Sequence, residues 1–107
     1  MITQLKKGAL ELCVLCTLDA GDKYGYQLIA HISEHFEVGE GTIYPLLKRI
    51  RLDGLVETYL MESSEGPPRK YYRLTQSGRE HKQALLEQWQ DFSHSVNQLI
   101  QEERKDG

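Results

Sequence analysis

The chain has 107 residues, which favours a single domain with a modest core and predicts that part of its stability comes from a partner subunit. Charged residues make up 27% and hydrophobic residues 39%, as in ordinary globular proteins, and the longest apolar run, at residues 12–18, is too short to span a bilayer. Lys6 and Lys7 are not followed by an apolar stretch with a cleavage site, so we expect no membrane association and a cytoplasmic location.

The formal net charge of −3 is unevenly distributed along the chain. Residues 1–41 carry a net charge of −3 and residues 82–107 a net charge of −2. Residues 42–81 hold seven Lys or Arg against five Asp or Glu, a net charge of +2. A basic middle third in an acidic protein favours a polyanionic partner for that segment.

The first half of the chain predicts three helices. Apolar residues over residues 5–18 form a stripe wide enough to be buried on two sides, and a loop follows at residues 19–23. Helical spacing continues over residues 24–35. After Gly39 and Gly41 the period restarts in a third helix that ends near Gly54, with Pro45 placed in its first turn.

The second half predicts a hairpin and a long helix. Residues 55–62 and 70–74 have strand character, and residues 63–68 form a turn-rich tip that contains both neighbouring prolines. Of the adjacent tyrosines, we expect Tyr72 to face the core and Tyr71 to be exposed. Thr75 is placed to cap a helix over residues 76–104, whose apolar residues recur at heptad spacing.

Four short motifs, in order between residues 24 and 78, resemble the PadR family of bacterial transcriptional regulators, and the resemblance extends over essentially the whole chain. They are YGYQL at residues 24–28, GTIYPLLKRI at 41–50, GLV at 54–56, and RKYYRLT at 69–75, which is followed by Gly78. The single C-terminal helix is similar to the short branch of the family. One departure is Arg51-Leu52-Asp53, where the family more often has acidic residues before the glycine.

The resemblance implies a mainly α fold with a small β-hairpin, a winged helix-turn-helix with a long C-terminal dimerisation helix. It implies a DNA-binding domain at residues 1–75 and a dimerisation helix at residues 76–107, packed as one compact unit. Its implied function is that of a homodimeric repressor on a pseudo-palindromic operator. A winged-helix protein–protein adaptor without DNA binding remains the alternative.

The third helix and the hairpin supply the predicted DNA contacts. Helical geometry places Ile43, Leu46, Leu47 and Ile50 toward the core and leaves the opposite face for a major groove. We assign Tyr44 and Lys48 to the backbone, Arg49 to a bidentate guanine contact, and Arg69 and Lys70 to phosphates or a minor groove. The predicted DNA-binding residues are Thr42, Tyr44, Pro45, Lys48, Arg49, Arg69 and Lys70.

The first and last helices carry the predicted dimer interface. Its residues are Leu5, Leu12, Leu85, Trp89, Phe92, Val96 and Leu99. Trp89 and Phe92 have two interpretations, as packing residues between subunits or as the contacts of a small planar aromatic effector. Some short relatives bind aromatic ligands at the dimer interface, which keeps the second interpretation open.

Enzymatic and metal functions have little support in the sequence. Cys13 and Cys16 lie in a strongly apolar helix without a second cysteine pair, and His31 and His35 have no obvious third ligand beside them. No nucleophile, base and orienting carboxylate form a recognisable set. We therefore expect no catalytic residues, no cofactor and no metal.

Overall fold

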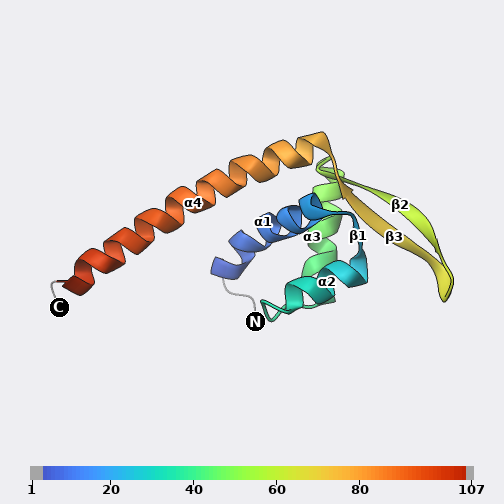
Figure 1. Cartoon of the computed structure of the whole chain (residues 1–107), viewed down its shortest axis with the longest axis horizontal. Coiled ribbons are helices and arrows are strands. Elements are labelled where there is room, and N and C mark those ends of the chain that lie inside the picture. Colours follow the sequence, from blue (N-terminus) through green and yellow to red (C-terminus); the bar gives the residue numbers. More distant parts are fainter. Residues whose placement is uncertain (1–3, 106–107) are drawn as a thin grey trace.

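A computed structural model describes the backbone of residues 4–105 and the side chains of residues 8–104. The elements are α1 (Gln4–Ala20), β1 (Lys23–Tyr24), α2 (Gly25–Ser33), α3 (Glu40–Leu52), β2 (Val56–Ser63), β3 (Gly66–Leu74) and α4 (Gln76–Lys105). The fold is the predicted mainly α winged helix-turn-helix with a long C-terminal helix, and the β2–β3 hairpin is its wing (Figure 1).

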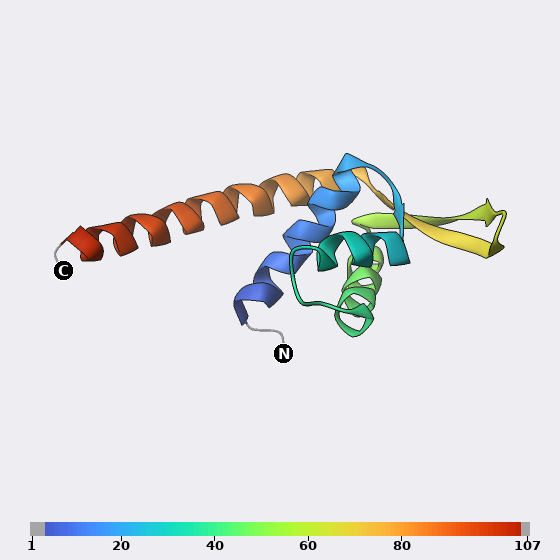
Figure 2. The ribbon, with the colours of Figure 1, turned by 60° about the horizontal axis from the view of Figure 1, so that its bottom comes forward.

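The molecule is elongated, with principal extents of 61 × 28 × 20 Å. The helices α1, α2 and α3 form a bundle in the middle, while α4 and the wing extend from it in opposite directions (Figure 2). The first part of α4 packs against α1, whereas its C-terminal part and the outer end of the wing project beyond the bundle (Figure 2).

One apolar core lies where the three bundle helices meet the base of the sheet. From α3 it takes Ile43, Leu47 and Ile50, each fully buried as their spacing predicts, while the fourth predicted residue, Leu46, is half-buried and packs against this core. The α1 helix contributes Leu10, Val14, Leu15 and Leu18. Leu12, on another side of α1, is buried next to α4, so the prediction that this helix is buried on two sides is confirmed.

The sheet has three antiparallel strands in the order β1-β3-β2. The sequence pattern does not predict β1, since it places Lys23 in a loop and Tyr24 in a helix. Lys23 pairs with Tyr72 and Tyr24 with Tyr71, and a two-residue strand is too short to leave a periodic pattern. Tyr72 is buried and Tyr71 is half-buried, so the core assignment of Tyr72 is confirmed.

The prolines of the wing are inside a strand, which corrects the predicted tip at residues 63–68. The β3 strand begins at Gly66 and includes Pro67 and Pro68, so the turn is confined to Ser64 and Glu65. The pairing register shifts between Met61 and Ser63, opposite the prolines. A bulge at the outer end of the hairpin tolerates residues without an N–H donor.

The placement of Pro45 also differs from the prediction. Because α3 begins at Glu40, Pro45 lies in the second turn of the helix and not in the first. Its missing N–H leaves the carbonyl of Gly41 without its usual partner. Gly41 is exposed, so that carbonyl is free to bond to solvent.

The start of α4 is tied to the end of α3. Thr75 caps α4 as predicted, because the Gly78 N–H donates to Thr75 Oγ1 at 3.0 Å. The Thr75 hydroxyl donates in turn to the Gly54 carbonyl at 2.7 Å, and the Thr75 N–H donates to the Leu55 carbonyl at 3.0 Å. Gly54, at φ 77°, ends the third helix in the left-handed conformation that glycine favours.

Candidate nucleic-acid interface

The α3 helix presents a polar face away from the core. Burial of Ile43, Leu47 and Ile50 turns Tyr44, Pro45 and Lys48 outward, and all three are exposed. Thr42 is half-buried. This is the arrangement that the helical period predicts for the outer side of α3.

Tyr44 is held against the start of α2. A Cβ atom added at Gly25 would lie 2.8 Å from Tyr44 Cε1 and 2.9 Å from its hydroxyl, so glycine is what allows the ring to approach. Beside it is a depression of about 360 Å³, which we call the aromatic cleft. The cleft is lined by Tyr24, Gly25, Tyr26, Tyr44, Arg69, Lys70 and Tyr72, and thus joins α3 to the wing.

The cations of the basic middle segment fall into two groups. Arg49 and Arg73 form ion pairs with carboxylates. Among the side chains of residues 8–104, the cations of this segment with no acidic partner within 4.0 Å include Lys48, Arg51, Arg69 and Lys70. All four are exposed, and they come from α3 and β3. Unneutralised cations on two adjoining elements suit a phosphate backbone.

Arg49 is directed toward α1. Its Nη2 lies 3.2 Å from Glu11 Oε1 and its Nη1 lies 3.6 Å from Asp53 Oδ2. Glu11 also lies 3.7 Å from His81 Nε2, so this carboxylate joins α1, α3 and α4. A guanidinium placed in this way must break two ion pairs before it can contact a guanine.

The predicted DNA-binding residues therefore divide between two flanks of α3. Tyr44, Arg69 and Lys70 surround the aromatic cleft on the wing side. Thr42, Pro45 and Arg49 line a second depression of about 350 Å³ on the α1 side, together with Leu10 and Leu46. Lys48 lines neither depression.

Arg51 is a candidate contact that the sequence analysis did not select. It follows Tyr44 by seven residues and Lys48 by three, so helical geometry places the three on one flank of α3. Burial raises the pKa of Tyr72, and the nearby positive charge of Arg51 partly offsets that rise. Arg51 thus lies near the base of the wing, and its spacing from Tyr44 was the available signal.

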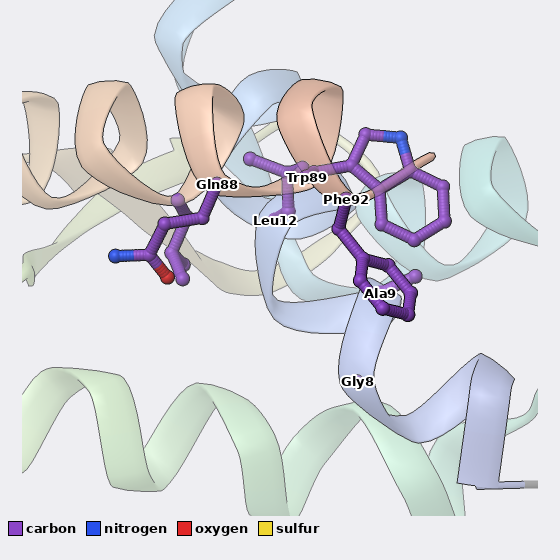
Figure 3. Close-up of a pocket in the computed structure, with 7 residues that line it drawn as sticks. Gly8, Ala9, Leu12, Gln88, Trp89 and Phe92 are labelled. Atoms are coloured by element: carbon purple, nitrogen blue, oxygen red, sulfur yellow. The ribbon is translucent and has the colours of Figure 1, made fainter. Parts of the chain in front are cut away.

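The predicted dimer residues lie on α1 and α4. Leu12 is buried and Leu85 half-buried already within one chain, whereas Trp89, Phe92, Val96 and Leu99 are 39–60% exposed. Trp89 and Phe92 extend from α4 toward Gly8 and Ala9 of α1 and line a depression of about 250 Å³ (Figure 3). The side chain of Leu5 lies outside the described residues.

Residues 14–84 match the transcriptional regulator PadR-like family. The chain belongs to this family. It is 40% identical to a PadR-like transcriptional regulator of Bacillus cereus, whose crystal structure superimposes with a TM-score of 0.85 over 92% of this chain and 98% of that one. It is 37% identical to a transcriptional regulator of Streptococcus, with a TM-score of 0.83 over 92% of this chain and 98% of that one. A transcriptional regulator of Mycobacterium tuberculosis is 32% identical over 77 residues, or 71% of each chain.

The resemblance drawn from the four motifs is thereby confirmed, and this PadR-like protein is a DNA-binding transcriptional regulator by family. Family members act as transcription factors, not as enzymes. Within residues 4–105 no helix is both long and apolar enough to cross a membrane.

Both cysteines and two of the four histidines of this PadR-like regulator line a depression between α1 and α2. Cys13, Cys16, His31 and His35 all line it, and its volume is about 320 Å³. Burial raises the pKa of both thiols, which makes them poor nucleophiles near neutral pH. In the described part of the chain, no three His, Cys, Asp or Glu side chains are grouped so that they could hold a metal ion.

Proposed function

We propose that this PadR-like regulator is a homodimeric repressor that binds a pseudo-palindromic operator through α3 and the wing. The observation that carries the proposal is a group of four cations, Lys48, Arg51, Arg69 and Lys70, on the two elements that border the aromatic cleft; none has an acidic partner among the side chains of residues 8–104. In a protein with a net charge of −3, such a local excess of positive charge favours a phosphate backbone as partner.

The roles within this surface follow from side-chain chemistry. Tyr44 and Lys48 contact the backbone, because a phenol and a flexible ammonium position a duplex better than they discriminate bases. Glu40 in the first turn of α3 repels phosphate from the helix end, which moves these contacts one turn along the helix. Thr42 and Pro45 supply small surfaces for a thymine methyl group. Direct base recognition is then modest, and DNA shape contributes the remainder.

The α4 helix supplies the dimer contact in this proposal. Phe92 is 60% exposed and Leu99 59% exposed, on a helix that extends away from the bundle. A second copy of the chain related by a two-fold axis would cover the exposed apolar residues of α4 in both subunits with one isologous contact. The dimer would present two copies of α3 to successive major grooves, about 34 Å apart or a multiple of that distance.

A small aromatic effector at this interface is the finer part of the proposal. The depression beside Trp89 and Phe92 is about 250 Å³ in one chain, and a dimer mate would enclose it further. Titration of planar aromatic compounds should quench Trp89 fluorescence and release the operator at the same concentrations. Quenching without release would leave Trp89 as a binding residue with no regulatory role, and no quenching would favour interface packing.

The salt dependence of binding tests the DNA surface. A labelled duplex containing the promoter of the regulator's own gene should lose affinity steeply as salt rises, and Lys48→Ala and Arg69→Ala should each lower the slope of log K against log salt by about 0.9. Arg104→Ala is the matched control, since it removes one positive charge from an exposed position near the far end of α4. If both surface variants bind like the wild type, the surface is misassigned; if the wild type binds no duplex, the adaptor function is favoured.

A further inference from the structure

The outer face of the sheet carries a row of three tyrosine rings with an arginine side chain at each end. Arg69 Cζ lies 4.6 Å from the centroid of the Tyr24 ring. The Tyr24 and Tyr71 rings are 5.5 Å apart, and the Tyr71 and Tyr59 rings are stacked at 5.6 Å. Arg73 Cζ lies 4.8 Å from the Tyr59 ring. We call this set the arginine–tyrosine row.

The row follows from strand geometry. Residues 69, 71 and 73 of β3 alternate with Lys70, Tyr72 and Leu74, so they share the face opposite the core. The short strand β1 adds Tyr24 on one side and β2 adds Tyr59 on the other, both paired with Tyr71. Without β1 the row would lack Tyr24, the ring that Arg69 contacts.

One end of the row is fixed by polar bonds and the other is not. Arg73 Nε donates to Glu57 Oε1 at 2.9 Å, and the Tyr59 hydroxyl donates to Asp22 Oδ2 at 2.6 Å. Arg69 has no side-chain hydrogen bond or ion pair to the side chains of residues 8–104. Its contact in the row is with the ring of Tyr24, over which the guanidinium carbon lies. The five N–H donors lie in the guanidinium plane and are left for another partner.

The row is not suited to stack nucleic-acid bases. Tyr59 is engaged by both Tyr71 and Arg73, and Tyr24 by both Tyr71 and Arg69. Rings that contact one another and two cations have little free π surface for a ligand. What the row leaves available is the hydrogen-bonding edge of Arg69, which also lines the aromatic cleft with Lys70 and Tyr44.

We propose that Tyr24 is a positioning residue that holds the Arg69 guanidinium at the rim of the aromatic cleft, ready for a DNA phosphate. This inference rests on the proposed function, since it names the residue that orders one of its DNA contacts. A long arginine side chain loses rotamer freedom when it binds. Holding it against a ring in the free protein reduces that loss at the moment of binding.

A double-mutant cycle on operator binding separates positioning from a general structural role. Tyr24→Leu should weaken binding roughly two- to five-fold, the size of an exposed cation–π contact, and should lower the salt slope toward that of Arg69→Ala. Tyr24→Phe keeps the ring and should bind like the wild type. The double variant Tyr24→Leu, Arg69→Ala should bind no more weakly than Arg69→Ala alone.

The proposal is overturned if the two losses multiply in the double variant, or if Tyr24→Leu binds like the wild type. A measurement on the unmodified protein covers the case in which Tyr24→Leu does not fold. The NMR order parameter of the Arg69 Nε–H group should exceed that of exposed Arg104, and equal mobility would contradict the proposal. Because this measurement needs no DNA, it still tests the row if the wild type binds no duplex.

Discussion

Gly25 and Tyr44 show how one missing side chain shapes the candidate interface. The Tyr44 ring occupies the space that a Cβ atom at position 25 would need, with the closest approach at 2.8 Å. Tyr44 is 40% exposed, so part of the ring rests on α2 while the rest faces the cleft. The fit between α2 and α3 thereby sets the direction of a predicted DNA contact.

Gly25→Ala should displace this ring. We expect operator binding to weaken several-fold and the free energy of unfolding to fall by about 1–3 kcal/mol, as overpacking does elsewhere. Gly41→Ala is the control for stability, because an added Cβ there meets no heavy atom within 4 Å, so the free energy of unfolding should not fall. Denaturant unfolding and fluorescence anisotropy measure the two effects. A Gly25→Ala protein with wild-type stability and affinity would show that the contact does not matter.

Arg49 has two possible roles, as a structural ion-pair partner or as a base contact, and the Arg49→Ala variant distinguishes them. Arg49 forms ion pairs with Glu11 and Asp53, and its side chain is half exposed. We therefore expect Arg49→Ala to lower the free energy of unfolding by less than about 1 kcal/mol. The same variant should weaken the binding of all operator variants equally. A bidentate guanine contact would instead relax the preference at one base pair by about 1–3 kcal/mol. Competition binding against a set of single-base operator variants distinguishes the two outcomes.

Among the elements, the junction of α3, the hairpin and α4 is held by closely packed backbone. A Cβ atom at Gly78 would collide with the Leu55 carbonyl oxygen and lie 2.7 Å from Leu74 Cδ1. Gly78→Ala should therefore lower the free energy of unfolding by roughly 1–3 kcal/mol or more, because backbone cannot move aside as a flexible side chain can. Gly66→Ala, with no heavy atom within 4 Å of the added Cβ, should leave it nearly unchanged. Thermal unfolding measures both variants, and equal melting temperatures for Gly78→Ala and Gly66→Ala would contradict the prediction.

The elements that the sequence predicted are those with a repeating pattern. The periodicity of Ile43, Leu47 and Ile50 identified α3 and its buried face, and Tyr72 was correctly assigned to the core. The strand β1 was not predictable, because two residues are too few to show a period. Pro67 and Pro68 were predicted in the turn and lie in β3, because the bulge that admits prolines depends on pairing across the hairpin.

The residues of the candidate site were predictable from the sequence, but the side chains that they contact were not. Lys48, Arg69 and Lys70 lie exposed where the sequence analysis expected them, and their DNA contacts stay predictions. The ion pair of Arg49 with Glu11 joins residues 38 positions apart in the chain, and the cation–π contact of Arg69 with Tyr24 joins residues 45 positions apart. Neither contact leaves a local signal, because both arise only when the bundle and the sheet have assembled.

At the scale of the whole molecule, the cationic surface and the exposed apolar residues of α4 are on separate parts of an elongated chain. We call the second set, Trp89, Phe92, Val96 and Leu99, the apolar stripe. The cations border the cleft between α3 and the wing, while Phe92 and Leu99 lie along the helix that extends the other way (Figure 1). Since α1 is packed against α4 and tied through Glu11 to Arg49 of α3, a shift of the paired α4 helices would change the separation of the two copies of α3. This is the mechanical route that we propose from an effector at Trp89 to the operator.

That route requires a dimer. A charge placed in the apolar stripe of α4 should dissociate it. Phe92→Glu buries an unpaired carboxylate between subunits and should shift the protein toward monomers, with a lower melting temperature and a weaker, non-dyadic footprint. Gln90→Glu adds the same charge to the same helix, about 160° around the helix from Phe92, and should remain dimeric. Sedimentation velocity across a range of concentrations measures both. A wild type that stays monomeric at every concentration would refute the dimer, and dissociation of both variants would show that charge on α4, and not the stripe, controls assembly.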